Sequence, residues 1–412
     1  MAQAAVLAAG LVTTYVLSRH LGVEGFGRFT YIFAFFYLFL LVNDFGVTTT
    51  VVREVSQDRE RAGEIIGAML SFRVLLSLIS MVAAWLVARL TDFPEDLRRS
   101  LYLFALILPL NALQLPSVIF QATMRVTYPV AVGIASRCLG VALTLWAVWA
   151  GYGLRAVVTA LVVTECFTTV LLFWGSRKFV RLTWGIRPGL WRRVLRSSAA
   201  LGAAGLFAGF INRADFLMLE RMSDLSQVGL YGVAYKVTNL LETFPLILMS
   251  TLYPLMSRYA VEDTDKLRRL FRKGTLYLGL VALVLGVAVT LGAPLIVHYL
   301  FGPQFAEAAR PLAILVWATA FMYLALIGGM VTLSLKRERT NLTILCVGAV
   351  LNFSLNLVWI PRWGCVGAAL STTVTFFFIL VATIATTHVY LKAKDSGLRV
   401  DFAGPSLKTV DS

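Results

Sequence analysis

Long hydrophobic runs repeat along the whole chain, and short polar segments separate them. About 20 apolar residues in a helix cross a bilayer core of ~30 Å, so runs of this length are typical of membrane-spanning helices. The pattern predicts an all-α polytopic membrane protein, because no long polar domain interrupts the runs. Twelve transmembrane helices are expected near residues 1–18, 29–51, 65–90, 101–124, 130–150, 155–175, 198–220, 229–254, 274–300, 308–334, 340–360 and 365–391.

The first run, "MAQAAVLAAGLVTTYVLSR", is apolar from its first residue and has no basic segment before it. That pattern differs from a secretory signal peptide, so we interpret it as the first membrane helix. A rise of 1.5 Å per residue gives residues 1–18 a length of roughly 27 Å, slightly less than the bilayer core. We therefore expect this helix to be shortened at its N-terminus.

Composition agrees with a membrane protein: 58% of the residues are hydrophobic and 14% are charged, against about 25% charged in soluble domains. The net charge of +15 is of the kind that suggests nucleic-acid binding. Most of these cations, however, lie between apolar runs, so we expect them to orient helices and expect no nucleic-acid partner. The four cysteines form no CxxC spacing and the three histidines are isolated, so neither a metal site nor a disulfide is predicted.

The loops alternate in positive charge. Loops two–three, four–five, six–seven, eight–nine and ten–eleven, with the C-terminal tail, hold 24 Lys and Arg, whereas the opposite loops hold 9. Basic loops stay in the cytoplasm, so we expect a multi-pass membrane protein with both termini cytoplasmic.

Two halves are predicted from the richest basic loop and from a faint internal repeat. Arg19 lies eight residues before Gly27, and Arg221 lies eight before Gly229; "GYGLRAVVTA" from 151 also resembles "RWGCVGAALS" from 362. The two pairs are offset by 202 and 211 residues, and repeats in the same order indicate duplicated units. The expected organisation is an N-terminal lobe (1–176), a basic cytoplasmic linker (177–196), a C-terminal lobe (197–392) and a polar cytoplasmic tail (393–412).

Charged residues occur inside the apolar runs, where each costs at least ~2.5–3.5 kcal/mol on insertion scales. Two interpretations stay open: they are interhelical pairs that hold helices together, or they line a water-filled central path. Snorkelling to the membrane surface is a further alternative for Arg137. The cations are Arg73, Arg137, Arg213 and Lys236, and the acids are Asp44, Glu165, Asp215 and Glu242.

Helical spacing groups several of these polar residues. Tyr231, Tyr235, Thr238 or Asn239, and Glu242 are predicted to form one stripe, and Asn352 stacks on Asn356 at i, i+4. Arg213 and Asp215 are two residues apart and therefore about 200° apart around a helix, which makes a direct pair unfavourable. An unpaired carboxylate in low dielectric prefers to be neutral, so Asp215 is a candidate for binding a proton or cation.

Four stretches then resemble one family: "LSRHLGVEGFGRFTYIFAF", "ADFLMLERMSDLSQVGLYGVAYKV", "LFGPQFAEAARPLAILVWA" and "LNFSLNLVWIPRWGCVGAALSTTV". In this order they resemble the oligosaccharide (Wzx-type) flippases of the multidrug/oligosaccharidyl-lipid/polysaccharide exporter superfamily. The resemblance implies two pseudo-symmetric six-helix lobes around a central cavity. It also implies alternating access and an undecaprenyl-pyrophosphate-linked oligosaccharide as the substrate.

The resemblance places Arg19 at a lateral portal, and it places Arg213, Asp215, Tyr235 and Lys236 on helices that line the cavity. The bilayer is part of the substrate's path, and a polysaccharide polymerase and glycosyltransferases are expected partners. No cofactor is expected, because no GxxxxGK[ST] loop is present; H+ or Na+ would drive transport instead. The candidate substrate-binding residues are Arg19, Arg73, Arg137, Arg213, Tyr231, Tyr235, Lys236, Asn239, Asn352 and Asn356, and the ion-coupling candidates are Asp44, Glu165, Asp215 and Glu242.

Two rival functions stay open. An ion-coupled antiporter of organic cations in the same superfamily would favour an acidic cavity, but four intramembrane acids face four cations, so the count does not decide. A membrane-embedded polysaccharide polymerase or ligase would present a large outer loop with catalytic groups. The longest outer loop here, 90–100, has about eleven residues, which favours a transporter over an enzyme.

The charge asymmetry generates a test of topology. In a cysteine-free background in intact cells, cysteines introduced into 177–196 or the C-terminal tail should be protected from a membrane-impermeant thiol reagent. A cysteine in the loop 90–100 should react and serves as the control. Labelling of the first two sites from outside would contradict the predicted orientation.

Overall fold

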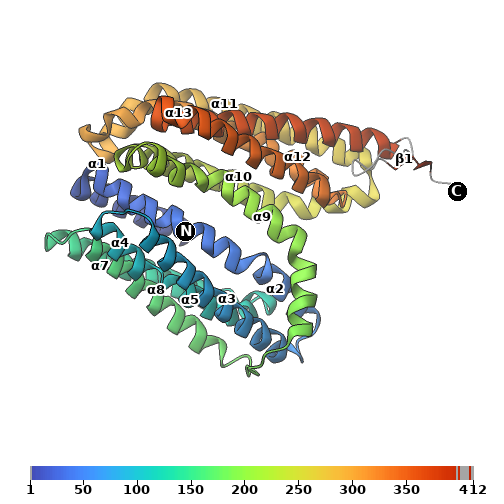
Figure 1. Cartoon of the computed structure of the whole chain (residues 1–412). Helices are drawn as coiled ribbons and strands as arrows, with labels where there is room; N and C mark the ends of the chain where they lie inside the picture. The colour runs from blue at the N-terminus through green and yellow to red at the C-terminus, as the bar shows by residue number, and fades with distance from the viewer. Residues whose placement is uncertain (1, 396–397, 400–407, 410–412) are drawn as a thin grey trace. The chain divides into compact units, whose positions relative to one another are not determined.

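The computed structural model describes residues 2–395, 398–399 and 408–409, and its elements are almost entirely helices (Figure 1). The predicted all-α fold is confirmed. The chain divides into two compact units, 1–209 and 210–412. The first contains α1 (Ala2–Asp44), α2 (Val47–Gln57), α3 (Ala62–Leu90), α4 (Glu95–Phe104), α5 (Ile107–Leu113), the 3₁₀ turn η1 (Leu115–Ser117), α6 (Val118–Ala122), α7 (Thr127–Trp149), α8 (Leu154–Ser176) and the first part of α9 (Pro188–Met222).

The second unit contains the end of α9 and four long helices (Figure 1). Its other elements are α10 (Leu225–Glu262), α11 (Thr264–Phe301), the 3₁₀ helix η2 (Pro303–Ala308), α12 (Ala309–Ser334) and α13 (Glu338–Asp395). Of the four long helices, α12 packs against the other three. Two short strands, β1 (Leu398–Arg399) and β2 (Lys408–Thr409), pair antiparallel. Most of the tail predicted over 393–412 lies outside the described residues.

The described part of the chain has nine helices that are long and apolar enough to cross a membrane, or ten if the segments 225–249 and 251–262, which meet at 42°, form one span. Two of the nine, Val12–Gln57 and Glu338–Lys394, have 46 and 57 residues, far more than the ~20 that one span requires. Each contains a glycine with non-helical backbone angles, Gly22 and Gly364. Each can therefore supply two spans, and the total of twelve stays a prediction.

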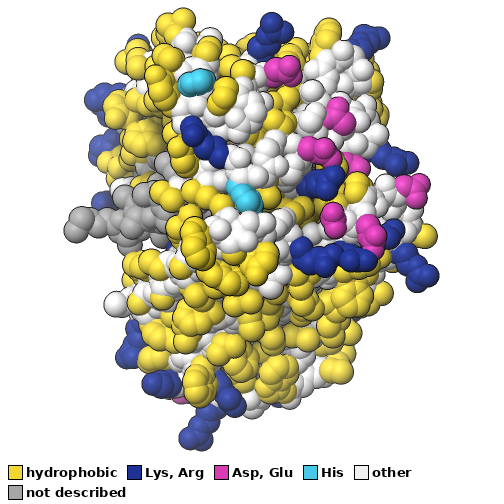
Figure 2. All heavy atoms as spheres, turned by 90° about the vertical axis from the view of Figure 1, so that its left-hand side faces the viewer, with side chains coloured by type: hydrophobic (Ala, Val, Ile, Leu, Met, Phe, Trp, Pro, Cys, Tyr) yellow, Lys and Arg dark blue, Asp and Glu magenta, His cyan; other side chains and the backbone are white. Residues whose placement is uncertain are grey.

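The surface of α11 shows why these helices suit a bilayer. One face of α11 packs inward through Phe271, Leu278 and Ala282. The exposed face is equally apolar, at Leu276, Leu280, Leu283, Val284, Val287, Leu291 and Leu295. Hydrophobic side chains likewise cover broad areas of the face drawn in Figure 2. A helix that is apolar all round has no water-facing side, as expected for one surrounded by protein and lipid.

The repeated sequence motifs fall on helix breaks. Gly22 divides α1, and residue 224, which follows it by 202, is the N-cap Asp224 between α9 and α10. Gly153 caps α8, and residue 364, which follows it by 211, is the glycine that divides α13. The weak similarity between the halves therefore marks equivalent ends of helices.

Residues 177–196 do not form a free linker. Val180 and Trp191 join the apolar core of the first unit, together with residues of α2, α3 and α6. A side chain at Gly63 or Gly67 of α3 would meet the backbone of Arg181 or Thr183 at 2.2–2.3 Å, so these two glycines permit the close approach. Residues from 188 onward are already helical, and the division between the units comes later, within α9.

Candidate functional site

Arg73 is the centre of a polar cluster inside the first unit. Its side chain is only 5% exposed and lies 3.4 Å from the carboxylate of Asp44. The guanidinium donates hydrogen bonds to Thr48 Oγ1 (3.0 Å) and to Asn111 Oδ1 (3.1 Å). Elements α1, α2, α3 and α5 therefore each contribute one polar group to this cluster, whose partners the sequence analysis had left open.

A cavity of about 350 Å³ opens beside this cluster. Ligand pockets have volumes of roughly 300–1,000 Å³, so this one is at the small end of the range. It combines carboxylate, guanidinium, amide, hydroxyl and phenol groups with a few aliphatic side chains. The polar residues that line it are Tyr37, Asp44, Thr48, Arg73, Asn111, Gln114, Ser117 and Gln121.

Gln114 links this cavity to a second carboxylate. Its amide nitrogen donates to Glu165 Oε1 (2.6 Å) and to Thr169 Oγ1 (3.0 Å), both on α8. Arg137 of α7, although exposed, is close enough for its charge to act on Glu165. Four of the predicted residues, Asp44, Arg73, Arg137 and Glu165, are thus brought near one another.

Asn111 and Gln114 were not among the predicted site residues. Both are polar residues within the apolar run 101–124, which was a usable signal. The run was predicted as one helix, but it is divided into the end of α4, α5, η1 and α6. The 3₁₀ turn contains Pro116, which lacks the backbone N–H of a regular helix.

Asp215 is the centre of the polar cluster of the second unit and is 1% exposed. Its carboxylate accepts hydrogen bonds from Tyr231 Oη (2.6 Å), Thr372 Oγ1 (2.6 Å) and Asn356 Nδ2 (2.7 Å). Asn356 also donates to Asn352 Oδ1 (3.1 Å). Within the described ranges, no ion pair to Asp215 is found. Asn352 and Asn356, which the i, i+4 spacing predicted to stack, therefore belong to the hydrogen-bond network of this carboxylate.

Arg213 has different neighbours from Asp215. Its guanidinium lies over the ring of Tyr235, 4.7 Å from the centroid, and 5.6 Å from the centroid of Phe216. The ring of Phe216 in turn contacts Tyr231 and Tyr235. Arg213 and Asp215 point away from each other because they are two residues apart on one helix. The aromatic rings therefore lie between the cation and the anion.

Of the two alternatives predicted for the stripe on α10, Thr238 fits the buried face and Asn239 does not. Tyr231, Tyr235 and Thr238 are buried, whereas Asn239 is exposed together with Lys236. At about 100° per residue, Thr238 lies about 20° from Tyr231 around the helix, whereas Asn239 lies about 80° from it, at the exposed edge of the stripe. Glu242 is half-buried and within electrostatic range of Arg213.

Arg19 is exposed, and its guanidinium lies 4.5 Å from the ring centroid of Tyr15. In the described part of the chain, no group of three or more His, Cys, Asp or Glu side chains is arranged to hold a metal ion.

Comparisons with known proteins agree with this helical architecture. Residues 16–310 match the family of polysaccharide biosynthesis proteins, and the chain belongs to that family. It is 22% identical over 363 residues to the probable low-salt glycan biosynthesis flippase Agl15 of Haloferax volcanii, which covers 87% of this chain and 75% of Agl15. It is also 27% identical over 187 residues to the uncharacterized membrane protein MJ1068 of Methanocaldococcus jannaschii, covering 45% of this chain but only 36% of MJ1068.

Solved structures with the same fold are transporters. The lipid II flippase MurJ in an inward closed conformation matches with a TM-score of 0.78 at 12% identity, covering 97% of this chain and 92% of MurJ. An inward-facing multidrug resistance MATE transporter of the MOP superfamily matches with a TM-score of 0.74 at 12% identity, covering 95% and 96% of the two chains. The predicted resemblance to this superfamily is confirmed.

The Asp215 cluster generates a test of its stabilising role. Tyr231→Phe removes a hydrogen bond to a buried carboxylate, so unfolding should become easier by about 1.5–3 kcal/mol. Thermal unfolding of the purified protein measures the change. Tyr277→Phe, at a tyrosine 55% exposed on α11, is the matched control. Equal melting temperatures for the two variants would show that the Tyr231 hydroxyl contributes nothing.

Proposed function

We propose that this protein is a flippase that moves polyprenyl-diphosphate-linked oligosaccharides from the cytoplasmic to the outer leaflet by alternating access. The family and the transporter fold support this class of function. The observation that carries the proposal is the buried Arg73 beside a polar cavity within otherwise apolar helices. The inner membrane and the cytoplasmic termini belong to the same proposal.

The diphosphate sets the main physical problem, because an anion cannot cross hydrocarbon without compensation. Arginine presents a planar fork of donors that matches phosphate oxygens. One terminal guanidinium nitrogen of Arg73 donates a hydrogen bond to Thr48 and the other donates to Asn111. Both acceptors are neutral, so water or substrate can replace them. A substrate oxygen entering the cavity can therefore take over donors of Arg73 without leaving a charge unpaired.

The remaining parts of the substrate have simpler needs. Sugar hydroxyl groups require both donors and acceptors, which Asn111, Gln114 and Gln121 supply along the cavity wall. The polyprenyl tail is as apolar as the bilayer and can stay in it while the head group moves. Glycosyltransferases would supply this substrate and a polysaccharide polymerase would consume it.

Arg73→Gln should lower the rate of translocation about tenfold, because one charge-assisted contact to the substrate is lost. The amount of protein in the membrane should stay constant. Translocation is measured as protection of a labelled lipid-linked oligosaccharide in vesicles. Arg89→Gln, at an exposed position on the same helix, should leave it unchanged.

A double variant separates substrate binding from charge balance. If Arg73 only neutralises Asp44, then Arg73→Gln combined with Asp44→Asn should recover transport, and that result would contradict the proposed role. Normal oligosaccharide transport by Arg73→Gln alone would do the same. Drug resistance conferred by the wild type, with no oligosaccharide transport, would favour the antiporter instead.

Asp215 supports an ion-coupled mechanism. All its described partners are neutral donors, so the ionised carboxylate carries a charge in low dielectric without a cation beside it. Binding of H+ or Na+ would remove this charge. Coupling arises if the two conformations differ in affinity for that ion.

In Asp215→Asn the side chain is always neutral, like the carboxyl group after it has bound a proton. Transport by this variant should therefore continue but no longer depend on the ion gradient. Transport is measured in vesicles with and without an imposed H+ or Na+ gradient. Glu165→Gln, which neutralises the half-buried carboxylate of the other cluster, is the comparison and should keep the dependence. Wild-type gradient dependence in Asp215→Asn would exclude Asp215 as the coupling group.

A further inference from the structure

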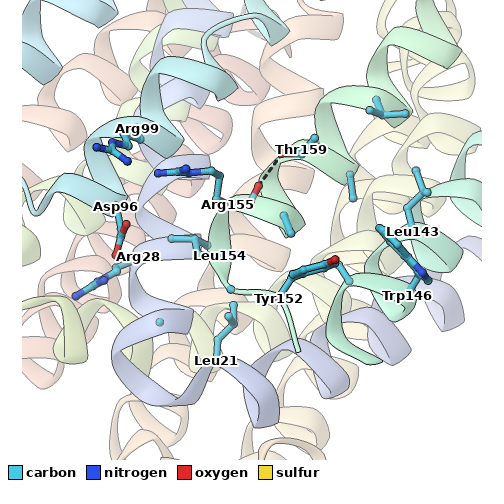
Figure 3. A pocket seen from close by; sticks show the side chains of 16 residues that line it. Leu21, Arg28, Asp96, Arg99, Leu143, Trp146, Tyr152, Leu154, Arg155 and Thr159 are labelled. Atoms are coloured by element: carbon cyan, nitrogen blue, oxygen red, sulfur yellow. Dashed lines mark hydrogen bonds between the residues drawn. The ribbon is translucent and has the colours of Figure 1, made fainter. Parts of the chain in front are cut away.

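A larger cavity lies at the opposite end of the first unit from the basic loops. It has a volume of about 1090 Å³ and is lined by residues of α1, α4, α7 and α8 and of the turn before α8 (Figure 3). Segments 21–28, 96–99 and 152–156 contribute to its wall, and all of them adjoin loops that the charge count assigns to the outer face. None of the residues that line it belongs to the Arg73 or Asp215 cluster.

Three arginines from three different helices line this cavity: Arg28, Arg99 and Arg155. Arg28 pairs with Glu24 at 2.7 Å and Arg99 pairs with Glu95, both at i, i+4 with at least one strongly exposed partner. Such exposed pairs are weak and are easily exchanged for another anion. The cavity therefore contains cations that a phosphate can recruit.

Arg155 is the least compensated of the three. Its side chain points from α8 toward α4, which carries Asp96 and Arg99, while Asp96 turns toward Arg28 (Figure 3). Across the described residues, the guanidinium of Arg155 forms no hydrogen bond or ion pair. A side chain in this state is available to a ligand.

The start of α8 adds a second attraction for anions. Gly153 is its N-cap and has no side chain to bind the first backbone N–H groups, and Gly153, Leu154 and Ala156 all line the cavity. A helix N-terminus carries a partial positive charge and free N–H donors. The preceding loop is fixed, because the ring nitrogen Nε2 of His20 lies 2.9 Å from the carbonyl oxygen of Tyr152.

Aromatic rings form another part of the wall. Trp146 and Tyr152 pack edge to face with their centroids 5.7 Å apart, and both are at least half exposed. Leu143 and Val163 continue the apolar surface. A ligand with an anionic head and an apolar or sugar portion matches this combination of arginines and rings.

The internal repeat places apolar residues at the positions equivalent to two of these arginines. The same offsets that align the helix breaks, 202 and 211, place Leu230 at the position of Arg28 and Val366 at that of Arg155. In the first unit, a side chain near the first motif contacts the backbone of the second motif, as His20 does with Tyr152. The second unit has a similar contact, because the backbone N–H of Cys365 donates to Gln227 Oε1 (3.0 Å). The arginines are thus specific to one of two similar helix ends.

We propose that this cavity binds the phosphate or diphosphate head group of a lipid on the outer side of the membrane. The natural ligand of the cavity follows from the proposed function, on which this proposal rests. That ligand would be the diphosphate of the translocated lipid, held after crossing and before release. The guanidinium groups and the N-terminus of α8 would hold the phosphate, while Trp146 and Tyr152 would cover the adjoining group. An anionic phospholipid offers the same head-group chemistry, so the experiment includes both.

The test uses the full chain in nanodiscs of zwitterionic lipid that contain either undecaprenyl diphosphate or phosphatidylglycerol, with lipid retention measured by native mass spectrometry. Wild-type protein should retain undecaprenyl diphosphate, and Arg155→Gln should bind it about tenfold more weakly, as expected for one charge-assisted contact. Arg28→Gln combined with Arg155→Gln should weaken it further. The control Arg89→Gln, at an exposed arginine outside the cavity, should match the wild type.

Equal retention by the wild type and the double variant would overturn the proposal. A photoreactive residue at Thr159, which lines the cavity, provides a measurement that does not depend on the arginine variants. It should crosslink to the lipid, and inorganic pyrophosphate should compete; no crosslink would also overturn the proposal. Stronger retention of phosphatidylglycerol, lost in the same variants, would support the site but assign it to phospholipid.

The two proposals fail in different ways. Normal translocation in Arg73→Gln with intact head-group binding would contradict the proposed role of Arg73 and leave the outer cavity unaffected. Normal translocation together with absent binding at Thr159 rejects the outer cavity and leaves the flippase intact. A wild type that binds lipid here but never translocates oligosaccharide contradicts only the proposed function.

Discussion

A polar group inside hydrocarbon must find its partners within the protein, since the bilayer core offers no water. This constraint explains both polar clusters. Arg73 is met by one carboxylate and two neutral acceptors, and Asp215 by three neutral donors. Each set comes from at least three helical segments, so satisfying one charge also fixes the packing of the helices around it.

The two clusters solve the problem differently, and the difference has chemical consequences. Arg73 lies beside a cavity and donates its hydrogen bonds to two neutral groups, so an anion that enters can replace these while Asp44 stays nearby. Asp215 is enclosed by donors with no described cation, so it is suited to a small cation or a proton. The proposed function therefore assigns substrate binding to the first arrangement and ion coupling to the second.

Glycines and prolines determine where the continuous helices end. Gly22 and Gly364 adopt positive φ inside long helical stretches, a conformation that is strained for other residues. Pro116 lies in the 3₁₀ turn between α5 and α6, close to Asn111 and Gln114. Both polar side chains reach the Arg73 cluster from this interrupted segment, so the irregular backbone lies where polar chemistry is concentrated.

The sequence by itself determined the class of protein, because hydrophobic run length and loop charge depend on single residues and their neighbours. It also indicated that Arg213 and Asp215 point apart and that Asn352 stacks on Asn356, since both follow from the turn of one helix. Contacts between helices depend on how distant segments pack, so only the tertiary structure joined Arg73 to Asn111, Asp215 to Thr372, and Arg28 to the cavity of Arg155. For the same reason residues 177–196 resembled a linker in the sequence, whereas in the structure they pack on glycines of α3.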